Sequence, residues 1–140
     1  MATLAKAVIG TSSYVKIEGV KDAVHAKVDT GADSSSVWAT DVFVDENNQL
    51  HYTLFAPHSA HYDGVQRVSK EYKISRVISS SGHMERRYKT PMVVTIEGRK
   101  VRAWFTLTSV RADRTHPMLI GRRTLYGKFL VDVSQRPEKW

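Results

Sequence analysis

The sequence predicts an all-β fold of about eight strands, arranged as a barrel or a sandwich. Short apolar runs rich in Val, Ile, Thr, Tyr and Phe recur along the chain, and clusters of Gly, Asn and Ser separate them. Two glycines stand where hairpin turns are expected, and only one segment has the signals of a helical turn. At 140 residues we expect a single domain over residues 1–140, with its core in residues 7–134.

The first half of the chain contains three candidate strands, in which apolar residues alternate with polar ones or run together. They occupy residues 7–20, with a break at residues 10–13, then residues 23–30 and residues 49–55. Clusters of Asp, Asn, Pro and Gly predict loops at residues 45–48 and 57–64. We therefore expect strands and loops, and no helix, in this half.

The second half contains five further candidate strands and the one predicted helical turn. Glu97-Gly98 is a two-residue loop between alternating runs, and Ser81-Gly82 lies at the tip of a longer hairpin that would project outward. Residues 122–127 predict a helical turn closed by Gly127, because glycine tolerates the left-handed conformation there. We expect the tail after residue 134 to be frayed. The strands occupy residues 71–79, 92–96, 99–110, 117–121 and 127–134.

Charge and composition narrow the classes of partner and site. The formal charge is +7, from 21 Lys and Arg against 14 Asp and Glu, which favours an acidic peptide, nucleic acid or an anionic membrane, or no anionic partner at all. The chain has no cysteine, which excludes disulfides, thiol nucleophiles and thiolate metal sites. No apolar run approaches the roughly 20 residues that span a bilayer, and the N-terminus lacks a secretory signal. We expect a soluble, cytoplasmic protein.

The main candidate site is the Asp-Thr-Gly turn at residues 29–31, directly after an alternating strand. Such a turn can exist for backbone reasons alone. Aspartic proteases, however, use two carboxylates that share a proton, each on an Asp-Thr-Gly or Asp-Ser-Gly turn. No other Asp in this chain has such a turn. The chemistry would therefore need Asp29 of a second copy across a two-fold axis.

A second signature follows in the order that this chemistry requires. Residues 117–134 contain two apolar residues and a glycine, Leu119-Ile120-Gly121, before the predicted helical turn. With the catalytic turn and the hairpin between them, these residues resemble the retropepsin fold, the single-lobe closed β-barrel with one short C-terminal helix of retroviral proteases. Together with residues 79–87, they are similar to a narrower bacterial and archaeal group often labelled ATP-dependent zinc proteases. The resemblance spans roughly residues 15–134.

The resemblance implies roles for individual residues. Asp29 would be the catalytic carboxylate, Thr30 would brace the turn and Gly31 would allow its tight backbone. Asp33 and Arg122 occupy positions that form an ion pair within one subunit of related proteases. The hairpin tip would form a flap that covers the substrate. The residues expected at the substrate are Ala32, Asp33, Ser80, Ser81, Gly82, His83, Ile120 and Arg122.

Other readings of the polar residues are weaker. The group's zinc label finds little support, because the chain has no HExxH motif. Ser34, Ser35 and Ser36 lack the Gly-x-Ser-x-Gly elbow of a serine nucleophile, although geometry could still bring His25 to them. Residues 99–107 mix basic and aromatic residues, which nucleic-acid binding would need, but mid-strand aromatics favour core and groove wall. We expect no metal, no cofactor and no nucleic acid. The histidines are His25, His51, His58, His61, His83 and His116.

The sequence thus favours a homodimeric aspartic peptidase that hydrolyses peptide or isopeptide bonds through an Asp29 dyad and activated water. In the group that it resembles, the genes often lie beside ATP-grasp ligases that add amino acids such as glutamate. This implies acidic or glutamylated substrates made by a partner ligase. The alternative is a catalytically weak retropepsin-like module that binds peptides or a partner protein.

Overall fold

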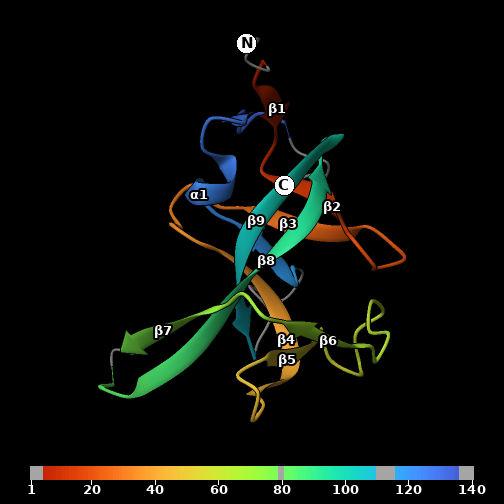
Figure 1. The fold of residues 1–140 in the computed structure, drawn as a ribbon. Helices are drawn as coiled ribbons and strands as arrows, with labels where there is room; N and C mark the ends of the chain where they lie inside the picture. Colours follow the sequence, from red (N-terminus) through yellow and green to blue (C-terminus); the bar gives the residue numbers. More distant parts are fainter. Residues whose placement is uncertain (1–4, 79–80, 110–115, 136–140) are drawn as a thin grey trace, which may run out of the picture.

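The computed structural model describes residues 5–78, 81–109 and 116–135, and in them the chain forms eleven strands and one short helix (Figure 1). The first six strands are β1 (Ala7–Ile9), β2 (Ser12–Ile17), β3 (Val24–Val28), β4 (Ser35–Val44), β5 (Leu50–Leu54) and β6 (Gln66–Ser69). The remaining elements are β7 (Lys73–Ile78), β8 (Met84–Ile96), β9 (Arg99–Thr108), β10 (Met118–Ile120), α1 (Arg122–Leu125) and β11 (Phe129–Val131). The prediction of a nearly all-β chain with one short helix near its C-terminus is confirmed.

Six of the strands close into a barrel, in the order β10, β3, β2, β8, β9 and β4. The closing strand is β10, which lies between β3 and β4. It pairs with β3 in parallel, with Ile120 opposite Val28, and with β4 in antiparallel, with Met118 opposite Val37. This closure confirms the predicted barrel, and it brings the C-terminal segment against the residues that flank the Asp-Thr-Gly turn.

The barrel strands follow the period-two pattern that a half-buried strand requires. In β9 the residues Val101, Ala103, Phe105 and Leu107 are buried, and the residues between them are more exposed. The buried apolar residues of the barrel form one cluster, to which β5, α1 and β11 also contribute. The core therefore sits inside the barrel and beneath these flanking elements.

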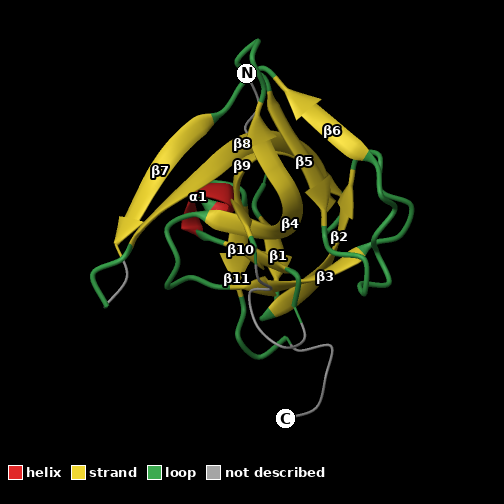
Figure 2. Ribbon diagram, turned by 90° about the horizontal axis from the view of Figure 1, so that it is seen from below, coloured by secondary structure: helices red, strands yellow, loops and turns green. Residues whose placement is uncertain are grey.

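Three parts of the chain lie outside the closed barrel. Strands β5 and β6 extend the sheet from β4, while β1 and β11 pair with each other in parallel. Strand β7 pairs with the first part of β8 to form a long hairpin. This hairpin projects away from the body of the barrel in both Figure 1 and Figure 2. Within the described residues, no helix is long and apolar enough to cross a membrane.

Two strands were not predicted, and a third was predicted too short. The segment 35–44 was not predicted as a strand, and it carries an irregularity after Thr40 with Asp41 at positive φ. The short strand β6 was also missed. Its sequence is polar, and among the described strands it pairs with β5 alone. Strand β8 begins at residue 84 and not at residue 92, and passes through Pro91. Pro91 falls between the stretch that pairs with β7 and the stretch that pairs with β2, where a strand tolerates proline.

The predicted turns are present where the structure describes them. Glu97 and Gly98 both have positive φ, as a two-residue hairpin turn requires. Gly127 follows α1 with φ +72°, the conformation expected of the residue that closes a helix. The tail predicted to fray lies mostly outside the described residues.

Candidate active site

The Asp29 turn is held at both ends by backbone hydrogen bonds. The amide of Asp29 donates to the carbonyl of Ile120 at 2.9 Å, which extends the pairing of β10 by one residue beyond β3. The amide of Ala32 donates to the carbonyl of Asp29 at 3.2 Å and closes the turn. The carboxylate accepts a hydrogen bond from the amide of Gly31 at 2.9 Å, and the Asp29 side chain is only half-buried. A positioned carboxylate therefore faces accessible space.

Gly31 has a different role from the one expected of a turn glycine. Its φ is not positive, so any residue could adopt its backbone conformation. A Cβ at this position would, however, lie 3.2 Å from Oδ1 of Asp29. Glycine therefore keeps the space around the carboxylate open.

Gly121 allows α1 to approach the Asp29 turn. A Cβ on Gly121 would lie 2.5 Å from the carbonyl oxygen of Ser34 and 2.9 Å from that of Ala32, and both are backbone atoms. Immediately after it, the amide of Arg122 donates to the carbonyl of Ala32 at 2.8 Å. Only glycine permits this contact, which explains the two apolar residues and glycine in the sequence.

The buried hydroxyl of Ser35 ties the same two segments together. Its Oγ accepts a hydrogen bond from the amide of Gly121 at 3.0 Å and lies 2.5 Å from Oγ1 of Thr124, which is also buried. The other polar group considered with the serine cluster, His25, has Nε2 2.9 Å from Oγ of Ser12. The hydrogen bonds of Ser35 therefore join two segments of the fold, and they are not those of an activated serine nucleophile.

Asp33 lies at the centre of a small charged network. Nη2 of Arg122 is 3.7 Å from Asp33, so the predicted ion pair is present, and Nη1 of Arg122 donates to the carbonyl of Thr30 at 2.9 Å. Arg123, for which no role was predicted, makes the shorter contact: its Nε lies 3.0 Å from Oδ2 of Asp33. The adjacent arginines in the sequence were the signal that could have found it. All three side chains are exposed, so each ion pair contributes little to stability.

The remaining predicted residues are distributed over three places. The side chain of Ile120 is fully buried in the core, and its carbonyl is what reaches Asp29. Thr30 is exposed and Ala32 is half-buried beside the carboxylate. Ser81, Gly82 and His83 are exposed at the tip of the β7–β8 hairpin, with Gly82 at φ +84°. Ser80 lies outside the described residues.

An apolar groove of about 550 Å³ adjoins the Asp29 turn. Thr30 and Arg122 form one end of the groove, and Leu125, Tyr126 and Leu130 form much of the rest. Tyr126 is 83% exposed and Leu130 is 54% exposed, which is unusual for large side chains beside a polar site. The Asp29 turn thus adjoins a surface whose exposed aromatic and aliphatic side chains are typical of a protein contact.

Three of the histidines have partners other than the Asp29 turn. His58 and His61, the two histidines that lie closest together in the sequence, pack against Trp38 and Phe55 at ring-centroid distances of 5.0 and 5.5 Å. Within the described part of the chain, no three His, Asp or Glu side chains gather in a way that could hold a metal ion. His51 bonds to Asp45 at 2.6 Å at the edge of the β4–β5 sheet.

Comparisons with known proteins agree with this architecture. A protein of Shewanella halifaxensis named "Probable alpha-L-glutamate ligase" is 28% identical over 134 residues, which is 93% of this chain and 29% of the relative. A similarly named protein of Parasynechococcus marenigrum is 27% identical over 131 residues, which is 91% of this chain and 28% of that relative. The chain thus spans less than a third of the length of the curated relatives that it matches.

A solved structure and a family model extend the comparison. A Legionella pneumophila protein of unknown function superposes with a TM-score of 0.72 at 20% identity, covering 94% of this chain and 96% of that one, which shows a shared fold. The family model for RimB-like proteins, described as retropepsin-like aspartic endopeptidase RimB, matches residues 8–138. The chain therefore belongs to the RimB-like family of retropepsin-like aspartic endopeptidases.

Proposed function

We propose that the protein is a homodimeric aspartic peptidase whose active site contains Asp29 from each of two chains. The observation that carries the proposal is a half-buried carboxylate, fixed by the Gly31 amide, on a turn that the chain contains only once. One such carboxylate is half of the pair that the chemistry needs. Symmetry about a two-fold axis would supply the other half.

In the proposed reaction the two carboxylates share one proton. The ionised Asp29 takes a proton from a water molecule, whose oxygen attacks the carbonyl carbon of the scissile amide. The protonated Asp29 of the second chain donates its proton to the carbonyl oxygen, which gives a neutral tetrahedral intermediate. Collapse of this intermediate breaks the C–N bond: the Asp29 that took a proton from the water gives it to the leaving nitrogen, and the other Asp29 takes a proton from a hydroxyl of the intermediate. This releases the carboxylic acid and the amine and restores the single proton of the dyad. Gly31 and Thr30 keep the carboxylate oriented in this scheme.

The apolar groove supports the dimer. It combines Thr30 of the catalytic turn with exposed Tyr126 and Leu130, and the β1–β11 sheet continues from it with half-exposed Val8. Covering this apolar surface would favour association, at roughly 25 cal/mol per Å² of apolar area buried. A second chain seated on it would also lie against the Asp29 turn. We therefore place the two-fold axis beside Thr30.

The β7–β8 hairpin is the proposed flap. Its tip at residues 80–83 would close over the bound peptide and exclude water from the dyad. Ala32, Asp33 and Arg122 would line the floor below it, whereas Ile120 would act by holding the turn. Residues 73–89 carry five basic side chains against one acidic one, Glu85. This charge favours acidic peptide segments.

The substrate class follows from charge and from the relatives together. The ligase names of the relatives concern those proteins, but they support a link between this domain and glutamate-adding chemistry. We propose acidic or glutamylated peptides, made by a partner ATP-grasp ligase, as substrates with peptide or isopeptide bonds. We take residues 1–140 as one domain and the cytoplasm as its location, with no metal, cofactor, membrane or nucleic acid involved.

A second candidate function is a catalytically weak peptide- or partner-binding module. It is favoured by the fact that the chain matches less than a third of each ligase-named relative, because such a segment could serve a ligase by binding its substrate. This candidate predicts peptide binding without turnover from acidic to neutral pH.

The decisive experiment compares the parent with Asp29→Asn on glutamate-rich peptides, with product detection by mass spectrometry. We expect Asp29→Asn to remain dimeric by analytical ultracentrifugation and to lose cleavage, while the parent shows a bell-shaped pH profile. Asp22→Asn, an exposed acid outside the site, is the matched control and should cleave like the parent. Equal cleavage by Asp29→Asn and the parent would overturn the mechanism, as would a parent that is active only as a monomer.

A further inference from the structure

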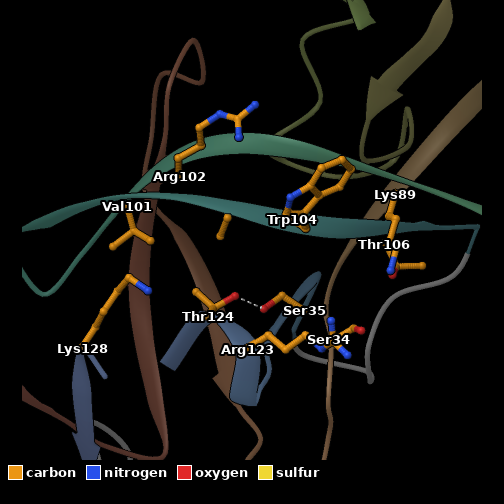
Figure 3. Close-up of a pocket in the computed structure, with 11 residues that line it drawn as sticks. Ser34, Ser35, Lys89, Val101, Arg102, Trp104, Thr106, Arg123, Thr124 and Lys128 are labelled. Atoms are coloured by element: carbon orange, nitrogen blue, oxygen red, sulfur yellow. Dashed lines mark hydrogen bonds between the residues drawn. The ribbon is translucent and has the colours of Figure 1, made fainter. Parts of the chain in front are cut away.

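A cavity of about 120 Å³ lies between Ser34 and Ser35 at the start of β4, α1 and the β8–β9 hairpin (Figure 3). Its volume is several times the roughly 30 Å³ that a water molecule occupies in the liquid, so it is large enough for one polar side chain. None of its eleven lining residues is acidic. Four of them are basic: Lys89, Arg102, Arg123 and Lys128.

Two of the four cations are paired at the rim of the cavity, and two are not. Arg102 pairs with Glu71, and Arg123 pairs with Asp33. Lys89 and Lys128 are half-buried, and neither makes an ion pair with an acid of the described residues. Charges that are partly removed from water attract an anion more strongly than fully solvated charges do. Among the described residues, therefore, Lys89 and Lys128 line the cavity without an acidic partner.

The floor of the cavity supplies a hydroxyl proton. Ser35 and Thr124 lie next to each other there, and one of their two hydroxyl protons forms the bond between them (Figure 3). The Gly121 amide already donates to Ser35 and uses one of its lone pairs. Whichever hydroxyl donates within the pair, the other keeps a proton for a further acceptor. A buried donor of this kind is stabilised by an anionic oxygen.

The remaining wall is an aromatic surface. The indole of Trp104 lines the cavity on β9, and Nζ of Lys73 lies 4.8 Å from its ring centroid. Thr106 and Lys89 are paired across β8 and β9, so a hydroxyl and an ammonium stand side by side on one wall. Such a wall can pack against the methylene groups of an acidic side chain while the ammonium group binds its carboxylate.

Some residues that line the cavity follow soon after the Asp29 turn in the sequence. Ser34, on its lining, comes five residues after Asp29, and Arg123 links it to Asp33. We propose that this cavity is a specificity subsite, which binds the side-chain carboxylate of a glutamate residue several positions away from the cleaved bond. The proposal rests on the proposed function in one respect, namely that the ligand is a peptide substrate. Lys89 and Lys128 would be its main determinants.

Binding is tested with Asp29→Asn protein, so that no turnover is needed. Calorimetry with a hexaglutamate peptide, at about 150 mM salt to screen exposed charges, should detect binding, and hexaglutamine should not bind. Lys128→Gln and Lys89→Gln should each weaken hexaglutamate binding about tenfold, as expected for loss of a charged contact. Lys128→Arg should retain most of the affinity. Lys100→Gln is the matched control on β9, and it should change affinity less than about twofold because Lys100 is exposed and outside the cavity.

Three outcomes would overturn the subsite. The first is that hexaglutamate does not bind, and the second is that hexaglutamine binds equally well. The third is that Lys128→Gln and Lys100→Gln lose the same affinity for hexaglutamate, which would indicate only general charge attraction. Thermal unfolding of each variant checks that the fold is retained, and Lys128→Arg rescue separates charge from packing.

A cleavage assay separates this proposal from the proposed function. In the parent, single Glu→Gln substitutions along a cleaved peptide should lower kcat/KM about tenfold at one remote position, and Lys128→Gln should abolish that difference. Asp29-dependent cleavage with no remote preference would refute the subsite and leave the peptidase intact. Cavity-dependent binding without Asp29-dependent cleavage would refute the peptidase and support the subsite in a binding module.

Discussion

The Asp29 turn and the β7–β8 hairpin are built in opposite ways. The turn follows β3 directly and is hydrogen-bonded by β10 and by the start of α1, with backbone atoms so close that Gly121 cannot carry a side chain. In the hairpin, residues 84–88 pair only with β7 among the described strands, and a cross-strand pair, Arg76 and Arg86, has like charges. Like charges in such positions are destabilising. The Asp29 turn thus has many close contacts, whereas the outer part of the hairpin has few, and the proposed function uses the first as the site of the carboxylate and the second as a flap.

The difference also shows where mutations should matter. In the turn the contacts are short and join buried or backbone groups. An added methyl group there would therefore meet atoms that cannot move away. In the hairpin most side chains are exposed and have few neighbours. Substitutions of the same kind in the two regions should therefore differ several-fold in their effect on stability.

The strongest way to break this comparison is to add one methyl group in each region. Gly121→Ala places a Cβ 2.5 Å from the carbonyl oxygen of Ser34, so it should lower the free energy of unfolding by about 3 kcal/mol or more, or prevent folding. Gly82→Ala meets no atom within 4 Å and pays only for its positive φ, about 1–2 kcal/mol at most. Urea denaturation followed by circular dichroism measures both. A Gly82→Ala loss as large as that of Gly121→Ala would show that the hairpin is as constrained as the turn.

A second comparison removes one hydroxyl in each region. Ser35→Ala leaves the Gly121 amide without its acceptor in a buried place, and should cost about 1–3 kcal/mol. Ser75→Ala, in the half-exposed middle of β7, should change stability by less than about 0.5 kcal/mol. Chemical denaturation of the two variants and the parent in one buffer gives the difference. If Ser35→Ala is as mild as Ser75→Ala, then the hydroxyl is not what joins β4 to α1.

The smallest expected effect is a change of stability with pH at a third region, the His51–Asp45 pair. A hydrogen bond to Asp45 raises the pKa of His51 above its ordinary value of 6.5, and a backbone bond from Gln49, followed by His51, lowers the pKa of Asp45 below 3.8. The His51 contribution to stability is therefore complete below pH 6.5 and is lost as pH rises through the raised pKa. The Asp45 contribution is present above pH 3.8 and is lost as pH falls through the lowered pKa.

Thermal unfolding of the parent and of His51→Gln tests this pair. Between about pH 6 and about pH 8 the parent should lose more stability than the variant does, because only the parent has this histidine to deprotonate. The turn and the hairpin should be unaffected, since the pair lies at the β4–β5 edge. Identical pH dependence in the two proteins would exclude a contribution from His51.

Local patterns were sufficient to predict much of the fold and of the site. The alternating strands, the Glu97-Gly98 hairpin, the helical turn before Gly127 and the Asp-Thr-Gly turn all depend on a few consecutive residues. The ion pair of Asp33 with Arg122 could be predicted because the resemblance to related proteases implied it. In each of these cases the information lies within a short stretch or a known motif.

The features that were missed depend on distant partners. Strand β4 begins in a run of serines that locally resembles a loop, and it becomes a strand because β9 and β10 supply hydrogen-bond partners on both sides. Arg123 and Ser35 gain their roles only when α1 meets the segment after the turn. A strand was predicted only at residues 92–96, whereas β8 continues through Pro91 because its first part pairs with β7 and its last part with β2. No local propensity contains these contacts.

The insertion of β10 between β3 and β4 also has a temporal consequence. Asp29 is held by the carbonyl of Ile120, which is synthesised roughly ninety residues later, and such distant pairing slows folding. During translation the carboxylate turn would therefore stay unassembled until the last part of the barrel leaves the ribosome. If the proposed dimeric peptidase is correct, its active site could not assemble before residues near Ile120 are made, which would keep the nascent chain inactive.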